Sequence, residues 1–324
     1  MKKRESSTEL NFTSVLIIYK LFEENAIKYA GLIAEYLIKR NFMSKLYVED
    51  HGPFKNINHT THSEIIIYER EIHAKEISLV VTIGGDGTIL WANNLFTGFA
   101  KPYFLTFNLG TLGYLSYYKC DEYEKVFNEL LDSKDRIISF ESRVTLDVEF
   151  ITEDKMLREL TLNCLNDVVF EKGGGTHMIK TDIFFNEEYL TTLRSDGVLI
   201  STSTGSTAYN LSAGGSIIHY DADVLILNAM CPFSLSFRPI IFSYGTEIKL
   251  ILDKSCPFAQ VGNDGINSYR IKPSEGKKVK LSPFNLKIII LDKIIGDPIK
   301  NWKNKMINQL GWNSEFKNNR TKNS

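Results

Sequence analysis

The sequence predicts an α/β domain built on a Rossmann-like parallel sheet, followed by a mostly β domain. In the first part of the chain, apolar strand-like runs alternate with helical patterns. Such alternation favours a parallel sheet with helices on its faces. From residue 139 onwards, short alternating apolar and polar runs dominate, which is typical of a sandwich or of layered sheets. The aromatic content of 12%, mostly Phe and Tyr, also fits a chain with many strands.

Each element of the first part has its own signal. Residues 14–19 (SVLIIY) form a continuous apolar run, as expected of a buried strand. Residues 23–40 place their apolar side chains, from Ile27 to Leu37, at helical spacing. The same two patterns predict further strands at 64–68, 78–83 and 103–107, and helices at 88–95 and 121–131.

The later part of the chain has few segments of helical period and length. Residues 186–188 (Asn-Glu-Glu) lie between two strand-like runs and are expected to form a hairpin loop. A last helix is expected at 301–310, before a polar tail at 317–324 that is expected to be disordered. These patterns divide the chain into an α/β domain at 1–138, a β-rich domain at 139–285 and a C-terminal segment at 286–324.

Charge, apolar runs and cysteine spacing limit the partners, the membrane association and the metal chemistry to be expected. The chain has 324 residues, with 38 Lys and Arg against 39 Asp and Glu, so no global field attracts nucleic acid or an anionic membrane. No apolar run is long enough to predict a transmembrane helix. The four cysteines show neither C-x-x-C pairing nor His at metal-ligand spacing. We therefore expect reduced thiols and a cytoplasmic protein, and the sequence assigns no metal ligands.

The sharpest local motif is a glycine loop around one aspartate. Residues 80–92 (VVTIGGDGTILWA) run from an apolar strand through Gly84, Gly85, Asp86 and Gly87 into a helix. Glycines and a helix N-terminus let backbone N–H groups approach phosphate oxygens. A carboxylate repels phosphate, so its presence favours a chemical role, such as accepting a proton or helping to hold Mg²⁺. The alternative is a plain strand-to-helix turn with Asp86 as the N-cap.

Three weaker motifs follow. A second glycine turn, 108–114 (NLGTLGY), comes after the strand at 103–107, so both turns are expected at one crevice. In the segment 194–215 (RSDGVLISTSTGSTAYNLSAGG), small hydroxyl residues suit sugar hydroxyls or phosphates. Asn166 and Asp167 interrupt an apolar run, and a buried carboxylate there would need partners such as ribose hydroxyls. Each motif has a purely structural alternative. On that alternative, the glycine turn is one of two tight turns, the hydroxyl-rich segment is a loop that caps a helix near residue 208, and Asn166-Asp167 is a β-bulge or strand end.

At these segments the sequence resembles the NAD kinase family, and its eukaryotic branch most closely. The resemblance spans residues 75–315 and rests on the conjunction of several motifs. They are GGDGT at 84–88, the turn at 108–115, Asn166-Asp167, Asp196-Gly197, TGSTAY at 204–209, Cys231-Pro232, SLSFRP at 234–239 and Asp264-Gly265. GGDGT alone is also found in lipid kinases, so the later motifs carry the specificity.

The resemblance implies phosphorylation of the 2′-hydroxyl of the adenosine ribose of NAD by ATP, with Mg²⁺. It makes Asp86 the proton acceptor and places the loop glycines near phosphates. It implies that NAD and ATP are the partners, that the C-terminal segment returns to the first domain, and that the protein is a homo-oligomer, a dimer or a tetramer. The nucleotide-binding residues that it implies are Gly84, Gly85, Gly87, Thr88, Asn166, Asp167, Arg194, Asp196, Thr204, Thr207, Ala208, Tyr209 and Ser212.

Three departures from the family pattern concern substrate preference. Asp167 stands where the family usually has Glu, and Phe233 where eukaryotic relatives often have His. Gly262-Asn263 replaces a Ser-Phe pair before the late Asp-Gly. Two other functions remain open. One is a lipid kinase with the same loop, which a phosphate-transfer assay with a lipid and with NAD as acceptor would distinguish. The other is a nucleotide sensor that binds the dinucleotide without turnover.

Overall fold

Parallel strands form the sheet of the first half of the molecule. The computed structural model describes residues 12–49, 54, 64–110, 113–131, 139–174, 176–282, 285–295 and 298–313. Within them, the strands of the first sheet lie in the order β3-β2-β1-β4-β5-β20-β7, with β6 beside β5. They are β1 (Ser14–Tyr19), β2 (Lys45–Val48), β3 (Glu64–Ile67), β4 (Leu79–Ile83), β5 (Tyr103–Asn108), β6 (Tyr118–Lys119), β7 (Ser139–Arg143) and β20 (Leu286–Ile290).

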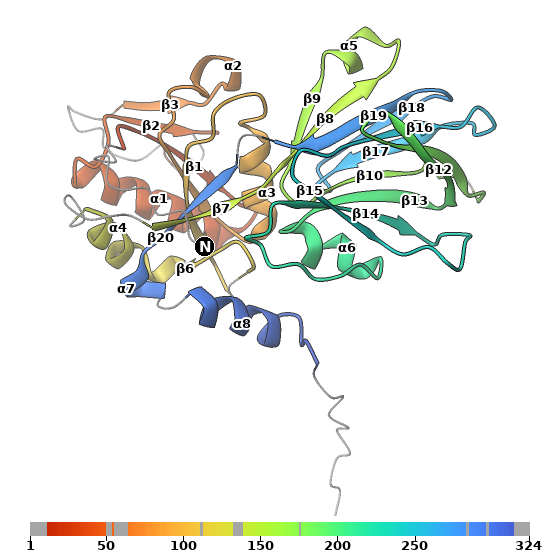
Figure 1. Cartoon of the computed structure of the whole chain (residues 1–324). Helices are drawn as coiled ribbons and strands as arrows, with labels where there is room; N and C mark the ends of the chain where they lie inside the picture. The colour runs from red at the N-terminus through yellow and green to blue at the C-terminus, as the bar shows by residue number, and fades with distance from the viewer. Residues whose placement is uncertain are drawn as a thin grey trace, which may run out of the picture.

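Helices flank this sheet (Figure 1). They are α1 (Glu24–Lys39), α2 (Arg70–His73), α3 (Asp86–Asn94), α4 (Tyr123–Leu131), which follows a 3₁₀ turn at Cys120–Glu122, α7 (Asp292–Ile295) and α8 (Pro298–Asn308). The central strands β1 and β4 are buried along their whole length, because the sheet is covered on both faces. Their residues and the apolar face of α1 share one core.

Two antiparallel sheets form the second half. One has the order β15-β14-β13-β10-β17-β18, the other β12-β11-β16-β19-β8-β9. The first comprises β10 (Asp167–Lys172), β13 (Gly197–Thr202), β14 (Val224–Met230), β15 (Ile240–Ser243), β17 (Ala259–Asn263) and β18 (Asn267–Ile271). The second comprises β8 (Leu146–Ile151), β9 (Thr161–Cys164), β11 (Ile179–Phe185), β12 (Glu188–Ser195), β16 (Glu247–Leu252) and β19 (Gly276–Leu281).

The two antiparallel sheets enclose a second core, drawn from the inward-facing residues of both. Strand β16 alternates partly buried and buried residues, as a strand with one face in a core does. Short helical segments lie between the strands: α5 (Lys155–Arg158), a 3₁₀ turn at Gly205–Thr207 and α6 (Tyr209–Ser212). The predicted α/β plus β-rich architecture is confirmed, and the hairpin loop at Asn186 and Glu187 joins β11 to β12.

Several boundaries differ from the sequence expectation. The helix after the glycine loop begins at Asp86, not at residue 88. Strand β2 was not expected from the sequence. Strand β7 pairs antiparallel with β20, so residues 139–143 lie in the first sheet, although the sequence assigned them to the β-rich region. The three-part division of the chain stays a prediction, and the tail at 317–324 lies outside the described residues.

Candidate active site

Asp86 is held in place by a neighbouring loop. It is the first residue of α3, at the carboxyl end of β4, and Gly85 is the N-cap. Its Oδ2 accepts a hydrogen bond from the backbone N–H of Tyr114 (2.8 Å) and its Oδ1 accepts one from the N–H of Leu115 (3.0 Å). The interpretation of Asp86 as an N-cap is therefore wrong. The two glycine motifs do meet, because the carboxylate of the first binds the backbone of the second.

The glycines of the two loops serve different purposes. A Cβ on Gly84 would lie 2.2 Å from the Oγ1 of Thr88, so the loop folds over its own threonine. A Cβ on Gly113 would lie 2.2 Å from the Oδ1 of Asp86. Gly85 and Gly87 have nothing within 4 Å of such a Cβ and face open space. A ligand therefore has backbone access at Gly85 and Gly87, where no side chain intervenes.

Asp264 organises the Asn166-Asp167 segment. Its carboxylate accepts hydrogen bonds from the backbone N–H groups of Leu165 (2.7 Å), Asn166 (2.8 Å) and Asp167 (3.0 Å). The backbone N–H of Asp264 in turn donates to the carbonyl of Asp167 at 3.0 Å. Asp264 adopts a left-handed φ of 47°, which places its carboxylate over the strand end. The sequence motif included this residue, but its function was not predicted.

Burial perturbs two neighbouring carboxylates here. Asp167 is 5% exposed, and burial together with the nearby Asp264 charge raises its pKa to about 7. Burial also raises the pKa of Asp264 to about 6, although three backbone N–H donors oppose the shift. Lys277 is fully buried, and burial lowers its pKa to about 7. Within the described residues, its Nζ has no hydrogen-bond partner.

A cavity of about 470 Å³ opens beside these carboxylates. Its volume falls in the range of small-molecule sites. Four residues expected to bind nucleotide line it: Asn166, Asp167, Ala208 and Tyr209. The ring of Tyr209 is partly exposed at 43%, and its hydroxyl contacts the sulfur of Met230. The cavity thus joins carboxylate acceptors to an aromatic surface, which suits a nucleoside.

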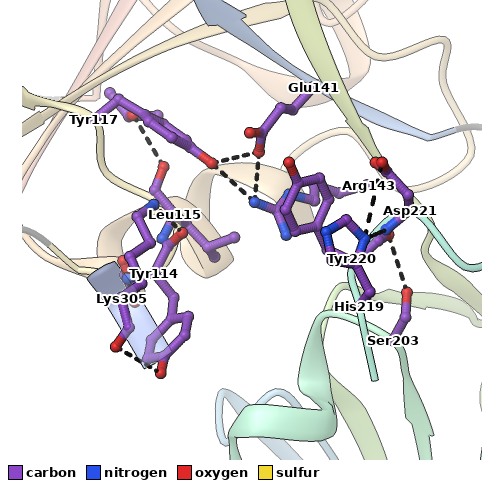
Figure 2. A network of polar contacts seen from close by, with 12 residues as sticks. Tyr114, Leu115, Tyr117, Glu141, Arg143, Ser203, His219, Tyr220, Asp221 and Lys305 are labelled. Atoms are coloured by element: carbon purple, nitrogen blue, oxygen red, sulfur yellow. Dashed lines mark hydrogen bonds and ion pairs between the residues drawn. The ribbon is translucent and has the colours of Figure 1, made fainter. Parts of the chain in front are cut away.

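A second, smaller cavity lies where the two halves meet. Thr204 and Thr207 line it from the β-rich half, and Tyr114 and Lys305 from the other side. Figure 2 shows the polar network on its wall, in which the Tyr117 hydroxyl, Glu141 and Arg143 bond to one another.

Lys305 belongs to this wall although it comes from the last helix. Its Nζ donates to the carbonyl of Tyr114 at 2.6 Å and lies 3.7 Å from the centre of the Tyr117 ring. Burial and, to a smaller extent, the Arg143 charge lower the pKa of Lys305 to about 7, although Glu141 and Asp86 act to raise it. Nothing in the sequence distinguishes Lys305 from the other lysines of the C-terminal segment, so this contact was not predicted.

The glycine loop at 84–88 lines neither cavity, and three further expected residues also lie outside both. Arg194 is exposed, and its guanidinium carbon lies 4.5 Å from the centre of the Phe233 ring. Asp196 forms an ion pair with Lys172 at 2.8 Å. Ser212 is exposed at the end of α6. The nucleotide roles of these three residues therefore rest on the sequence motif.

The described part of the chain contains neither a metal-binding cluster nor a membrane-spanning helix. There, no group of three or more His, Cys, Asp and Glu side chains is arranged to hold a metal ion. In the same residues, no helix combines the length and the apolar character needed to cross a bilayer.

The fold and the glycine loops define a nucleotide-dependent phosphotransferase, and comparison with known proteins gives its family. The model of the ATP-NAD kinase N-terminal domain matches residues 15–135, and that of the C-terminal domain matches residues 165–291. The NAD kinase of Saccharophagus degradans is 34% identical over 280 residues, which cover 86% of this chain and 91% of that protein. The chain belongs to the ATP-NAD kinase family, and its activity is phosphorylation of NAD.

Yeast relatives and solved structures support the same assignment. The mitochondrial NADH kinase of Saccharomyces cerevisiae is 40% identical over 172 residues, which cover 53% of this chain and 41% of that protein. A crystal structure of yeast NADH kinase complexed with NADH superposes with a TM-score of 0.82 at 26% identity, covering 94% of this chain and 89% of the other. An Archaeoglobus fulgidus NAD kinase in complex with ATP shares the fold, with a TM-score of 0.65 at 19% identity and coverage of 90% and 99%.

Proposed function

We propose that the protein transfers the γ-phosphoryl group of Mg-ATP to the 2′-hydroxyl of the adenosine ribose of NAD, with Asp86 as the general base. The observation that carries this proposal is the placement of the Asp86 carboxylate in a loop whose glycines leave the backbone open to phosphates. The 2′-oxygen attacks the γ-phosphorus in line, the bond to the β,γ-bridging oxygen breaks, and ADP leaves. Asp86 takes the proton of the hydroxyl as the new P–O bond forms.

The cavity beside Asp167 supports its role as the nucleoside site. A carboxylate accepts two hydrogen bonds from adjacent hydroxyls, which matches a ribose diol. Among the described residues, no side chain donates to the Asp167 carboxylate, so its oxygens are available to a ligand. Asn166 provides a neighbouring amide, and Thr207, Ala208, Tyr209 and Ser212 are assigned to the adenosine. Asp196, with Arg194, is assigned to the nucleotide.

Mg²⁺ enters this proposal with ATP. The ion commonly keeps several waters and binds through one or two carboxylates together with substrate phosphates. The donor set fits that mode, because the glycine loop contains one carboxylate, Asp86, and the described residues contain no three-ligand cluster. The triphosphate would hold the ion, which neutralises phosphate charge when bound.

A coupled assay for NADP formation tests the reaction. Purified protein with NAD, ATP and Mg²⁺ is expected to form NADP, and chelation of Mg²⁺ is expected to abolish turnover. The assay run in parallel with NADH measures the preference between the two acceptors, since the relatives include both NAD kinases and NADH kinases. Phosphorylation of diacylglycerol with no turnover of either dinucleotide would refute the proposal, and so would dinucleotide binding without turnover.

The proposal includes a homo-oligomer whose contact lies in the β-rich half. Strand β15 is the edge of its sheet, and exposed apolar side chains lie along it and in the segments just before and after it. They are Phe233, Leu235, Ile240, Ile241 and Tyr244. An apolar sheet edge is a ready surface for pairing. Light scattering is expected to show a dimer or a tetramer; a 37.0 kDa monomer with full activity at assay concentration would refute this part.

We also propose the cytoplasm as the compartment, on the grounds of four free cysteines. Two relatives, from Saccharomyces cerevisiae and Schizosaccharomyces pombe, are mitochondrial NADH kinases. Fractionation of cells that express the full chain distinguishes the two compartments.

A further inference from the structure

One peptide group lies between two charged side chains of opposite sign. The peptide that links Tyr114 to Leu115 contains the carbonyl of Tyr114 and the N–H of Leu115. Its N–H donates to the Oδ1 of Asp86 at 3.0 Å, and its carbonyl accepts from the Nζ of Lys305 at 2.6 Å. Because a peptide group is planar, a rotation that moves its carbonyl also moves its N–H. The two side chains therefore fix the orientation of the same plane.

The two charges also strengthen each other's hydrogen bond. When Lys305 is protonated, its ammonium group at the carbonyl and the Asp86 carboxylate at the N–H polarise the peptide in the same direction, and bonds linked in this way reinforce one another. Lys305 is 6% exposed, so little solvent screens its contact. The Asp86 charge also raises the pKa of Lys305, against the lowering effect of burial.

The helix that carries Lys305 is itself fixed by both halves of the molecule. Helix α8 lies below the region where the two halves meet (Figure 1). The Tyr114 hydroxyl donates to the carbonyl of Lys305 at 3.3 Å, and the side chain of Gln309 donates to the carbonyl of Gly113 at 3.3 Å. On the other side, the ring of Trp302 lies 4.8 Å from that of His219 in the β-rich half. Lys305 thus reaches the loop from a supported position.

We propose that Lys305 is a positioning residue for the phosphoryl transfer, which orients the Asp86 carboxylate through the peptide group between Tyr114 and Leu115. This inference rests on the proposed role of Asp86 as general base. Lys305 acts on the loop and needs no contact with substrate. Loss of its ammonium group frees the carbonyl of Tyr114, lets the peptide rotate and weakens the bond from Leu115 to Asp86. The base then spends less time aimed at the 2′-hydroxyl.

The test is a double-mutant cycle between Lys305 and Asp86. Lys305→Met keeps the length and apolar stem of the side chain and removes the donor. It is expected to lower kcat about 10- to 100-fold, the scale for misplacement of a catalytic group, with KM for NAD and ATP within about threefold of wild type. In an Asp86→Asn background, the same change is expected to alter kcat by less than about twofold, since there is no base left to orient.

Controls separate positioning from a general effect on the fold. Lys303→Met, at an exposed position of the same helix, is expected to leave kcat unchanged. Thermal unfolding of each variant checks the fold. If Lys305→Met does not fold, Lys305→Gln takes its place in both backgrounds.

The outcomes distinguish this inference from the proposed function. The positioning role is overturned if kcat is unchanged in Lys305→Met, or if kcat falls by the same factor in both backgrounds. In either case the kcat of Asp86→Asn still tests whether Asp86 is the general base. A full kcat in Asp86→Asn overturns the base itself and the positioning role with it. Loss of kcat in Lys305→Met that vanishes in the Asp86→Asn background supports both.

Discussion

Gly113 lies against Asp86 so closely that a Cβ on the glycine would stand 2.2 Å from the Oδ1 of the aspartate. The approach follows from the hydrogen bond between the N–H of Tyr114, the next residue, and the Asp86 carboxylate. No side chain fits between the two residues. The position of the Asp86 carboxylate therefore requires a glycine at residue 113.

Gly113→Ala is expected to lower kcat at least about tenfold. The new methyl group must displace either the Asp86 carboxylate or the loop, and small displacements of a catalytic group carry large rate losses. Gly110→Ala is the matched control, because a Cβ there meets nothing within 4 Å. Steady-state kinetics on the two variants test the difference; equal kcat values for both would show that the contact is unimportant for turnover.

Asp167→Ala is expected to weaken NAD binding by about 1.5–3 kcal/mol, the scale for hydrogen bonds to a charged group. The carboxylate lines the larger cavity and is available to ribose hydroxyls. Calorimetric titration with NAD measures the change, and circular dichroism checks that the variant is folded. An intact variant with wild-type affinity for NAD would remove Asp167 from the site.

Asp167 also makes the stability of the protein depend on pH. Its pKa is about 7 in the folded chain, against an ordinary value of 3.8 for an aspartate carboxyl. A raised pKa gives stability that is fully present below the unfolded value and is lost as pH rises through the folded value. As the pH rises from about 4 to about 7, the free energy of unfolding therefore falls by up to about 1.4 kcal/mol per pH unit because of this group.

Asp167→Asn removes this titration and leaves Asp264 in place. Relative to wild type, the variant is expected to gain stability on going from pH 5 to pH 7. Urea unfolding of both proteins at the two pH values measures the difference. A constant difference in unfolding free energy would mean that the folded pKa of Asp167 is near its ordinary value.

Local patterns predicted most of the fold, because continuous apolar runs and glycine turns are visible in short windows. Strand β2 was missed because its apolar run (LYV) has only three residues, whereas the run at 65–68 has four. The membership of β7 in the first sheet depends on pairing with β20, more than a hundred residues later, which no local window contains. The resemblance, and not periodicity, supplied the expectation that the C-terminal segment returns to the first domain.

The site was predicted where a motif marks it and missed where only distant packing makes it. Asp86, Asn166 and Asp167 stand out in the sequence as polar residues at the ends of apolar runs. Asp264 binds a backbone segment 99 residues away at Leu165, and Lys305 binds a carbonyl 191 residues away at Tyr114. Such contacts depend on burial and chain geometry that composition and spacing do not contain.

The kcat of Asp86→Asn, measured together with nucleotide affinity, tests the central claim most directly. Asparagine keeps the size and polarity of the side chain but does not accept the proton. A positioned base contributes about 10²–10⁴-fold, so kcat is expected to fall by two to four decades. Affinity for ATP is expected to hold or improve, because a negative charge beside the phosphates is removed. A folded Asp86→Asn variant whose kcat stays within about threefold of wild type would contradict general-base catalysis by Asp86.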